Sequence, residues 1–91
     1  MRRRVTVYYS GHVQGVGFRY TVRSVARGYE VCGTIRNLAD GRVALVAEGP
    51  KAELDEFLSA VRRCGLGPLI GQEETRWSDA ADDMHGFAII G

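Results

Sequence analysis

The sequence has little of what marks metal centres, membrane spans or nucleic-acid binding. Its two cysteines, Cys32 and Cys64, lack C-x-x-C or related metal-ligand spacing. No run approaches the roughly 20 apolar residues of a membrane span. The residues after Met1 and its three arginines are too polar for the core of a signal peptide. The net charge is only +1, and no basic stripe accompanies the aromatic residues. We therefore expect no metal, no cofactor, no membrane and no nucleic acid as partners.

These absences leave the composition of an ordinary soluble globule. Of the 91 residues, 45% are hydrophobic and 25% are charged. This length suits one domain, residues 1–91, and we expect a cytoplasmic monomer. Sequence alone leaves a disulfide between Cys32 and Cys64 open, but cytosolic thiols are rarely paired, so we expect both to be free and buried.

Hydrophobic periodicity divides the chain into strands and helices. Val5, Val7 and Tyr9 alternate as in a half-buried strand, whereas apolar residues from 18 to 29 recur at helical spacing. Asp40-Gly41 separates two further alternating segments and predicts a hairpin. The predicted strands are residues 4–10, 31–37, 43–47, 70–77 and 87–90. The predicted helices are residues 18–29, with Gly28 as a stop, and 50–64, with Pro50 in the first turn and Gly65 as a stop.

The order β-α-β-β-α-β, with a terminal strand added, predicts an α+β, ferredoxin-like sandwich. In this fold both helices cover one face of an antiparallel sheet. The first two strands run the same way, joined by a right-handed crossover, and the third lies between them. The segment after the first strand, the start of the first helix and Asn37 at the end of the second strand should therefore meet at one edge. Alternation turns Asn37 toward the helices.

Residues 11–19, "GHVQGVGFR", place three glycines within seven positions and then an arginine. Glycine costs backbone entropy, so such a cluster needs a reason. One reason is a tight turn; another is a loop whose backbone N–H groups form a nest around an anion at a helix N-terminus. Arg19 would add a planar fork that matches two phosphate oxygens.

These motifs resemble the acylphosphatase family. Two segments match the two signatures of that family. The first is residues 11–19 with Ala26, and the second is "GTIRN" at residues 33–37 with "DGRV…EG" between residues 40 and 49. The likeness spans the chain. Three departures are small. Tyr9 replaces an aliphatic residue, Thr34 replaces an aromatic one on the face away from the helices, and Ile35 is larger than usual.

The resemblance implies hydrolysis of small acyl phosphates to a carboxylate and inorganic phosphate without a metal, with phosphate as an inhibitor. It also implies that Arg19 binds the phosphate and that Asn37 orients the attacking water. The backbone amides of the loop would cradle the phosphoryl oxygens: Gln14, Gly15, Val16, Gly17 and Phe18. The chemistry is reasonable without an acid, because the leaving carboxylate has a conjugate acid of pKa about 4.

Other interpretations stay open from the residues alone. Arg19 by itself reads as a solvated helix arginine, and Asn37 as a turn former. His12 and His85 are expected to be loop residues without a role. The same fold could serve as a non-catalytic module that binds a phosphorylated metabolite. It could also be a detached domain of the hydrogenase-maturation carbamoyltransferase. That enzyme is far longer, and this chain ends after its last predicted strand, so we expect a free-standing enzyme.

Overall fold

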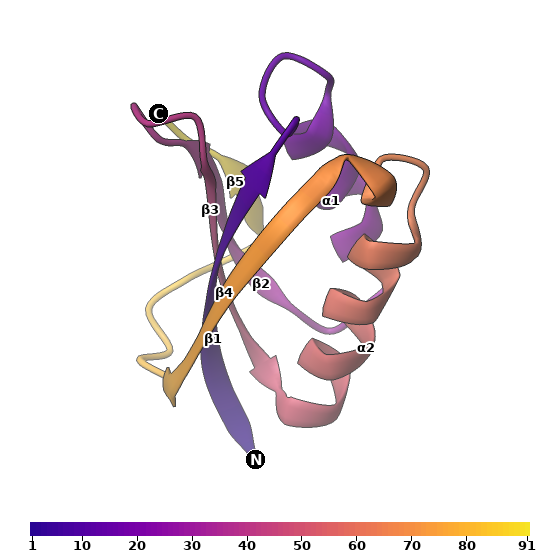
Figure 1. Ribbon diagram of the computed structural model, residues 1–91. Helices are drawn as coiled ribbons and strands as arrows, with labels where there is room; N and C mark the ends of the chain where they lie inside the picture. Colours follow the sequence, from indigo (N-terminus) through magenta and orange to yellow (C-terminus); the bar gives the residue numbers. More distant parts are fainter.

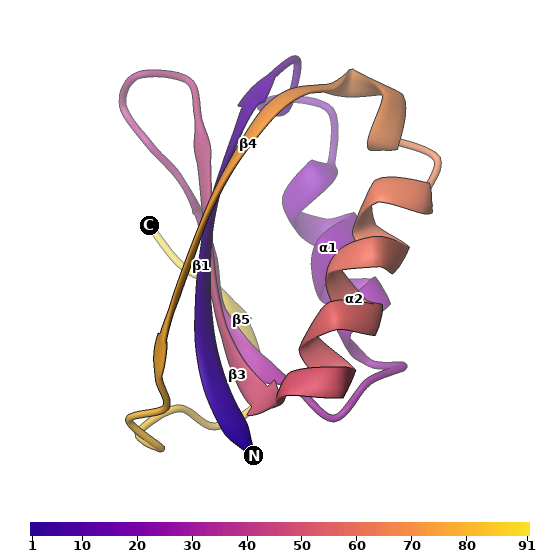
Figure 2. The same cartoon turned by 60° about the horizontal axis from the view of Figure 1, so that its bottom comes forward.

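The computed structural model describes residues 1–91 and contains a five-stranded sheet and two α-helices (Figure 1). The elements follow one another as β1 (Arg2–Gly11), α1 (Phe18–Ala26), β2 (Cys32–Asn37), β3 (Val43–Pro50), α2 (Lys51–Arg63), a short 3-10 helix (Gly67–Leu69), β4 (Ile70–Asp79) and β5 (Phe87–Ile89). Both helices lie on one face of the sheet (Figure 2). This arrangement confirms the predicted ferredoxin-like sandwich.

The strand order is β4-β1-β3-β2-β5, so β3 separates β1 from β2 as expected. The pairs β1–β3, β1–β4 and β2–β3 are antiparallel, but β5 pairs with β2 in parallel, from Gly33 with Phe87 to Ile35 with Ile89. The sheet is therefore mixed rather than purely antiparallel. After β4 the chain crosses the helix-free face of the sheet in residues 80–86 and reaches the opposite edge, where only a parallel strand fits its direction (Figure 1).

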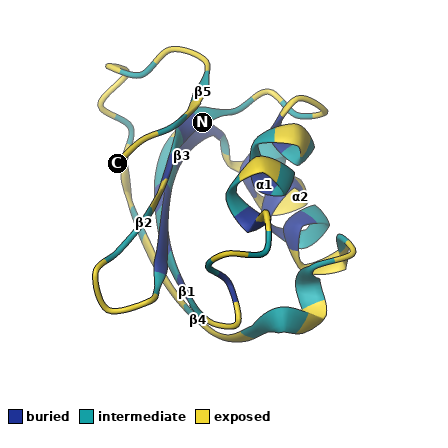
Figure 3. Cartoon of the chain, turned by 90° about the horizontal axis from the view of Figure 1, so that it is seen from above, coloured by how far each residue is buried: buried dark blue, intermediate teal, exposed yellow.

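The core lies between the sheet and the helices, as the alternation in the strands predicts. Val5, Val7 and Tyr9 are fully buried, with 0% exposure. In Figure 3 the buried residues of both helices face the sheet and the exposed ones face outward. Burial of these apolar faces, at about 25 cal/mol per Å², is the main force that holds helices and sheet together.

The helix ends differ in detail from the predictions. The first helix ends at Ala26, three residues earlier than expected, and Tyr29 packs against the core from the turn that follows. Pro50 is the cap before α2 rather than a residue of its first turn. Neither Gly28 nor Gly65 has a positive φ, so neither helix ends in the left-handed glycine that the sequence suggested.

The predicted hairpin forms between β2 and β3. Leu38 N–H donates to Arg42 O at 2.7 Å, and Gly41 has φ 94°. These are the marks of a three-residue loop closed by a left-handed glycine rather than a two-residue turn. The thiols of Cys32 and Cys64 are free and partly buried. Neither helix is long and apolar enough to cross a membrane.

Candidate active site

The loop between β1 and α1 and the hairpin between β2 and β3 lie at the same end of the molecule, opposite the N-terminus (Figure 1). The cause is topological. β1 and β2 are each antiparallel to β3, so they run the same way and both end there. Residues 11–19 and Asn37 therefore belong to one region, as the sequence predicted.

The loop is anchored at both ends by buried side chains. Val13 and Phe18 are each 1% exposed, and the Phe18 ring packs edge-on against Tyr9 with centroids 5.2 Å apart. Between these anchors Gly15 and Gly17 have φ angles of 77° and 82°. A Cβ at either glycine would meet nothing within 4 Å. Glycine is needed here for the left-handed backbone, not for lack of room.

The backbone amides of this loop are free. No N–H group of residues 14–18 donates a hydrogen bond to any backbone or side-chain acceptor of the protein. Gly17 precedes α1 without a side-chain cap, and the first turn of the helix holds no acidic residue. The positive end of the helix dipole and a run of unpaired donors are thus left without an anionic partner, which is the setting that favours a bound phosphate.

Arg19, in the first turn of α1, is half-buried and forms no ion pair or hydrogen bond with another protein group. Some other arginines of the chain are paired, as Arg4 is with Glu48 and Arg62 with Glu73. A guanidinium held at the surface without a counter-ion is available to an incoming anion.

Asn37 ends β2, where its backbone pairs with Val43. Its Oδ1 atom is buried and has no hydrogen-bond partner. Buried amide oxygens without a partner are uncommon, and such an atom is expected to accept a hydrogen bond from a water or a ligand. An acceptor without a donor is what a group that orients water requires.

One contact of the site was not foreseen. The Gln14 side-chain amide donates to both Leu38 O and Arg42 O at 2.9 Å. The loop is thereby tied to the residue that follows Asn37. A glutamine among glycines and valines is the only local signal, and it cannot reveal which carbonyls it meets, because these belong to another part of the chain.

Other features of the surface lie apart from this group. Two hollows of about 520 and 440 Å³ lie beside β4, and neither is lined by Arg19 or Asn37. No three His, Cys, Asp or Glu side chains gather as metal ligands do. His12 is exposed. The pKa of Asp40, on the hairpin, is lowered first by the backbone N–H of Arg42 and then by its guanidinium.

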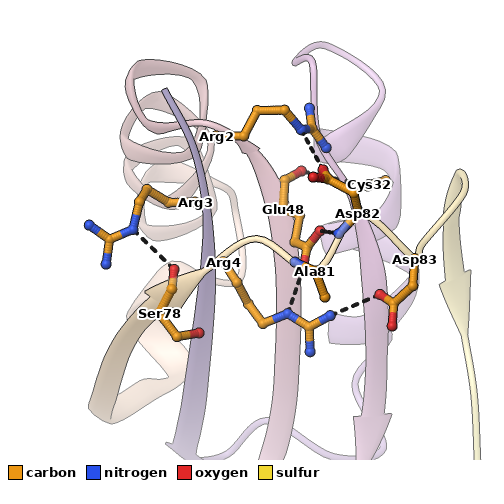
Figure 4. A network of polar contacts seen from close by, with 9 residues as sticks. All are labelled: Arg2, Arg3, Arg4, Cys32, Glu48, Ser78, Ala81, Asp82 and Asp83. Atoms are coloured by element: carbon orange, nitrogen blue, oxygen red, sulfur yellow. Dashed lines mark hydrogen bonds and ion pairs between the residues drawn. The ribbon is translucent and has the colours of Figure 1, made fainter.

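A buried carboxylate at the opposite end of the sheet was also missed (Figure 4). Glu48 of β3 is 0% exposed and accepts from Arg4 and from the N–H groups of Ala81 and Asp82. An acidic residue inside the apolar strand "VALVAEGP" was the available signal. This cluster is structural and far along the strands from the loop.

Comparison with known proteins agrees with the geometry over the whole length. A family model described as acylphosphatase matches residues 5–89. An acylphosphatase of Salinibacter ruber is 44% identical over 90 residues, which cover 96% of this chain and 92% of that protein. The crystal structure of an acylphosphatase from Bacillus subtilis has a TM-score of 0.89 and 32% identity, and covers 98% of this chain and 99% of its own.

HypF from T. kodakarensis has the same fold in one part. Its TM-score is 0.82 at 24% identity, and the match covers 97% of this chain but 12% of that chain. At this identity the likeness concerns the fold alone. The match across residues 5–89 and the identity to whole relatives are what decide the family. This chain belongs to the acylphosphatase family, hydrolases that act on the acid anhydride bond of acyl phosphates.

Proposed function

We propose that this chain cleaves the carboxyl–phosphate bond of small acyl phosphates by in-line attack of water. The amides of residues 14–18 and the guanidinium of Arg19 hold the phosphoryl oxygens, and Asn37 orients the water. The observation that carries the proposal is the coincidence of unsatisfied groups. Five consecutive free amides, an unpaired arginine and an orphaned amide oxygen belong to two segments that Gln14 links.

The proposed chemistry needs positioning and charge stabilisation more than acid–base groups. The oxygen of water forms a bond to phosphorus while the bond from phosphorus to the acyl oxygen breaks, and the carboxylate leaves with the electron pair. A carboxylate whose conjugate acid has a pKa of about 4 leaves without protonation. Alcohols are far poorer leaving groups, so ordinary phosphate esters should be spared.

Each group has one task in this proposal. The loop amides and Arg19 face the negative charge on the equatorial oxygens, where one preorganised donor is typically worth a factor of about 10²–10³ in rate. The Oδ1 atom of Asn37 accepts one hydrogen of the attacking water. Its amide is not a base near neutral pH, so the proton of the water leaves to a phosphate oxygen or to solvent.

The direct test is hydrolysis of benzoyl phosphate, followed by loss of absorbance, with excess chelator present. We expect turnover with chelator, none on p-nitrophenyl phosphate, and competitive inhibition by inorganic phosphate. Arg19→Gln and Asn37→Ala should each lower kcat/KM by about 10²-fold or more without unfolding the protein. Arg27→Gln, an exposed arginine at the end of the same helix, is the matched control and should keep full activity.

The outcomes separate this proposal from its competitor. Phosphate binding without turnover would support a module that senses a phosphorylated metabolite. Full activity of Asn37→Ala would remove the proposed role of that residue while leaving the hydrolase standing. Absence of phosphate inhibition would contradict the cradle formed by the loop.

A further inference from the structure

The carboxamide of Gln14 makes the only hydrogen bonds that join residues 13–16 to the rest of the protein. Both bonds come from Nε2, are 2.9 Å long and are partly buried. The acceptors are the two carbonyls at the base of the β2–β3 hairpin. Leu38 O also accepts from Gly41 N–H, and Arg42 O also accepts from Leu38 N–H, so the hairpin end is one bonded unit.

The loop needs such an attachment. Glycine at positions 15 and 17 lets the backbone move, and the amides of residues 14–18 have no internal partners to fix their direction. The buried side chains of Val13 and Phe18 hold the two ends, and between them only Val16 packs against the core, partly buried, through an apolar contact that sets no direction for the amides. Preorganisation of the amides therefore depends on a bond made by the middle of the loop itself.

We propose that Gln14 is a positioning residue that fixes the phosphate loop against the hairpin carrying Asn37. The inference deepens the proposed function and rests on it. Asn37 lies one residue before Leu38, so the same bonds set the distance between the amides that hold phosphate and the oxygen that orients water. Misplacement by about 1 Å between such groups can cost about 10²-fold in rate.

The role depends on both hydrogens of the amide. Gln14→Ala removes both hydrogen bonds from Nε2, so that the carbonyls of Leu38 and Arg42 each lose this donor. Gln14→Glu keeps the shape, but an ionised carboxylate has no donor and faces two carbonyl oxygens, whereas a protonated carboxyl regains one donor. The pKa of that introduced carboxyl should be raised above about 4.3, because the carbonyls disfavour the charged form.

The experiment is a double-mutant cycle with benzoyl phosphate as the substrate. We expect Gln14→Ala to lower kcat by about 10–100-fold in the native background, and by less than about threefold when Asn37 is already alanine, because the two residues act as one unit. Gln72→Ala is the control: the side chain of Gln72 is exposed on β4 and forms no hydrogen bond, so its removal should leave kcat unchanged in both backgrounds. Equal losses in both backgrounds, or kcat of Gln14→Ala within twofold of native, would overturn the proposal.

A pH profile distinguishes positioning from a general loss of structure. The activity of Gln14→Glu, divided by that of the native protein at the same pH, should rise several-fold as the pH falls from 7 toward about 4. A ratio that stays flat would mean that the hydrogen bonds do not set the rate.

A titration with inorganic phosphate keeps this inference separate from the proposed activity. Amide chemical shifts of residues 14–18 report phosphate binding whether or not the chain hydrolyses benzoyl phosphate. Gln14→Ala should weaken phosphate binding about tenfold or more; unchanged affinity would contradict the proposal. Lack of turnover by the native protein, with phosphate binding that depends on Gln14, would refute the hydrolase proposal alone.

Discussion

Tyr9 places an unpaired hydroxyl group in an otherwise apolar core. The residue is 0% exposed, packs on Phe18, and its oxygen has no hydrogen-bond partner. Burial, and then the nearby charge of Glu73, raise the pKa of this phenol. The alternation of β1 predicted its place on the core face, but the lack of a partner depends on what α2 and β4 bring next to it, which no local pattern contains.

Tyr9→Phe should stabilise the protein. An unsatisfied buried polar group costs about 1–3 kcal/mol, and phenylalanine keeps the ring contacts while removing that group. We expect the free energy of unfolding, measured by urea denaturation, to rise by about 1 kcal/mol and the midpoint of thermal unfolding to rise by roughly 4–8 °C. Tyr8→Phe, on the other face of β1, is the control. A loss of stability in Tyr9→Phe would mean that the hydroxyl binds a water in solution.

The loop between β1 and α1 is the element whose backbone, rather than its side chains, carries the proposed function. Gly17→Ala tests this, because a Cβ there meets nothing within 4 Å and the φ of 82° is the only obstacle. A left-handed alanine costs about 1–2 kcal/mol, so the loop should relax and turn its amides away. We expect at least a tenfold rise in the inhibition constant of phosphate.

Gly65→Ala is the matched control for that substitution. Gly65 is exposed, has open space around it and lacks a positive φ, so the same change should leave phosphate inhibition as it was. If phosphate inhibits Gly17→Ala with the same inhibition constant as the native protein, the left-handed backbone is not what presents the amides.

Elements and their order follow from periodicity and turn residues, and the two motifs place Arg19 and Asn37 at one edge before any coordinates are known. The features that could not be predicted from the sequence depend on contacts between distant segments. The parallel pairing of β5 follows from the path of residues 80–86, and the bonds of Gln14 follow from the position of a loop against a hairpin. Neither has a local signature.

At the scale of the whole molecule, Glu48 holds the segment after β4 against the helix-free face of the sheet (Figure 4). Its carboxylate accepts from Ala81 and Asp82 N–H at 2.9 and 3.0 Å and from Arg4 Nε at 2.6 Å. Asp82, at φ 56°, in turn pairs with Arg2, and Asp83 pairs with Arg4. One buried charge thus joins β1, β3 and the crossing that leads to β5.

The stability of the whole protein should therefore fall in acid. Burial alone would raise the pKa of Glu48, but the N–H groups of Ala81 and Asp82 and the guanidinium of Arg4 together hold it below its usual value of 4.5. A pKa lowered by folding contributes stability above the unfolded-state pKa, and this is lost as the pH falls through the folded-state pKa. Glu48→Gln should cost roughly 1.5–3 kcal/mol at pH 7, because hydrogen bonds to a buried charge are lost.

The measurement is the free energy of unfolding in urea at several values between pH 7 and pH 2.5. The difference in free energy of unfolding between the native protein and Glu48→Gln should be constant from pH 7 to about 5 and should shrink as the pH falls through the lowered pKa of the native carboxyl. Glu56→Gln, at an exposed site of α2 without a partner, should follow the native curve throughout. A difference that stayed constant down to pH 2.5 would show that the amide is a poorer fit than the carboxyl in either protonation state, and that the charge of Glu48 does not hold the crossing in place.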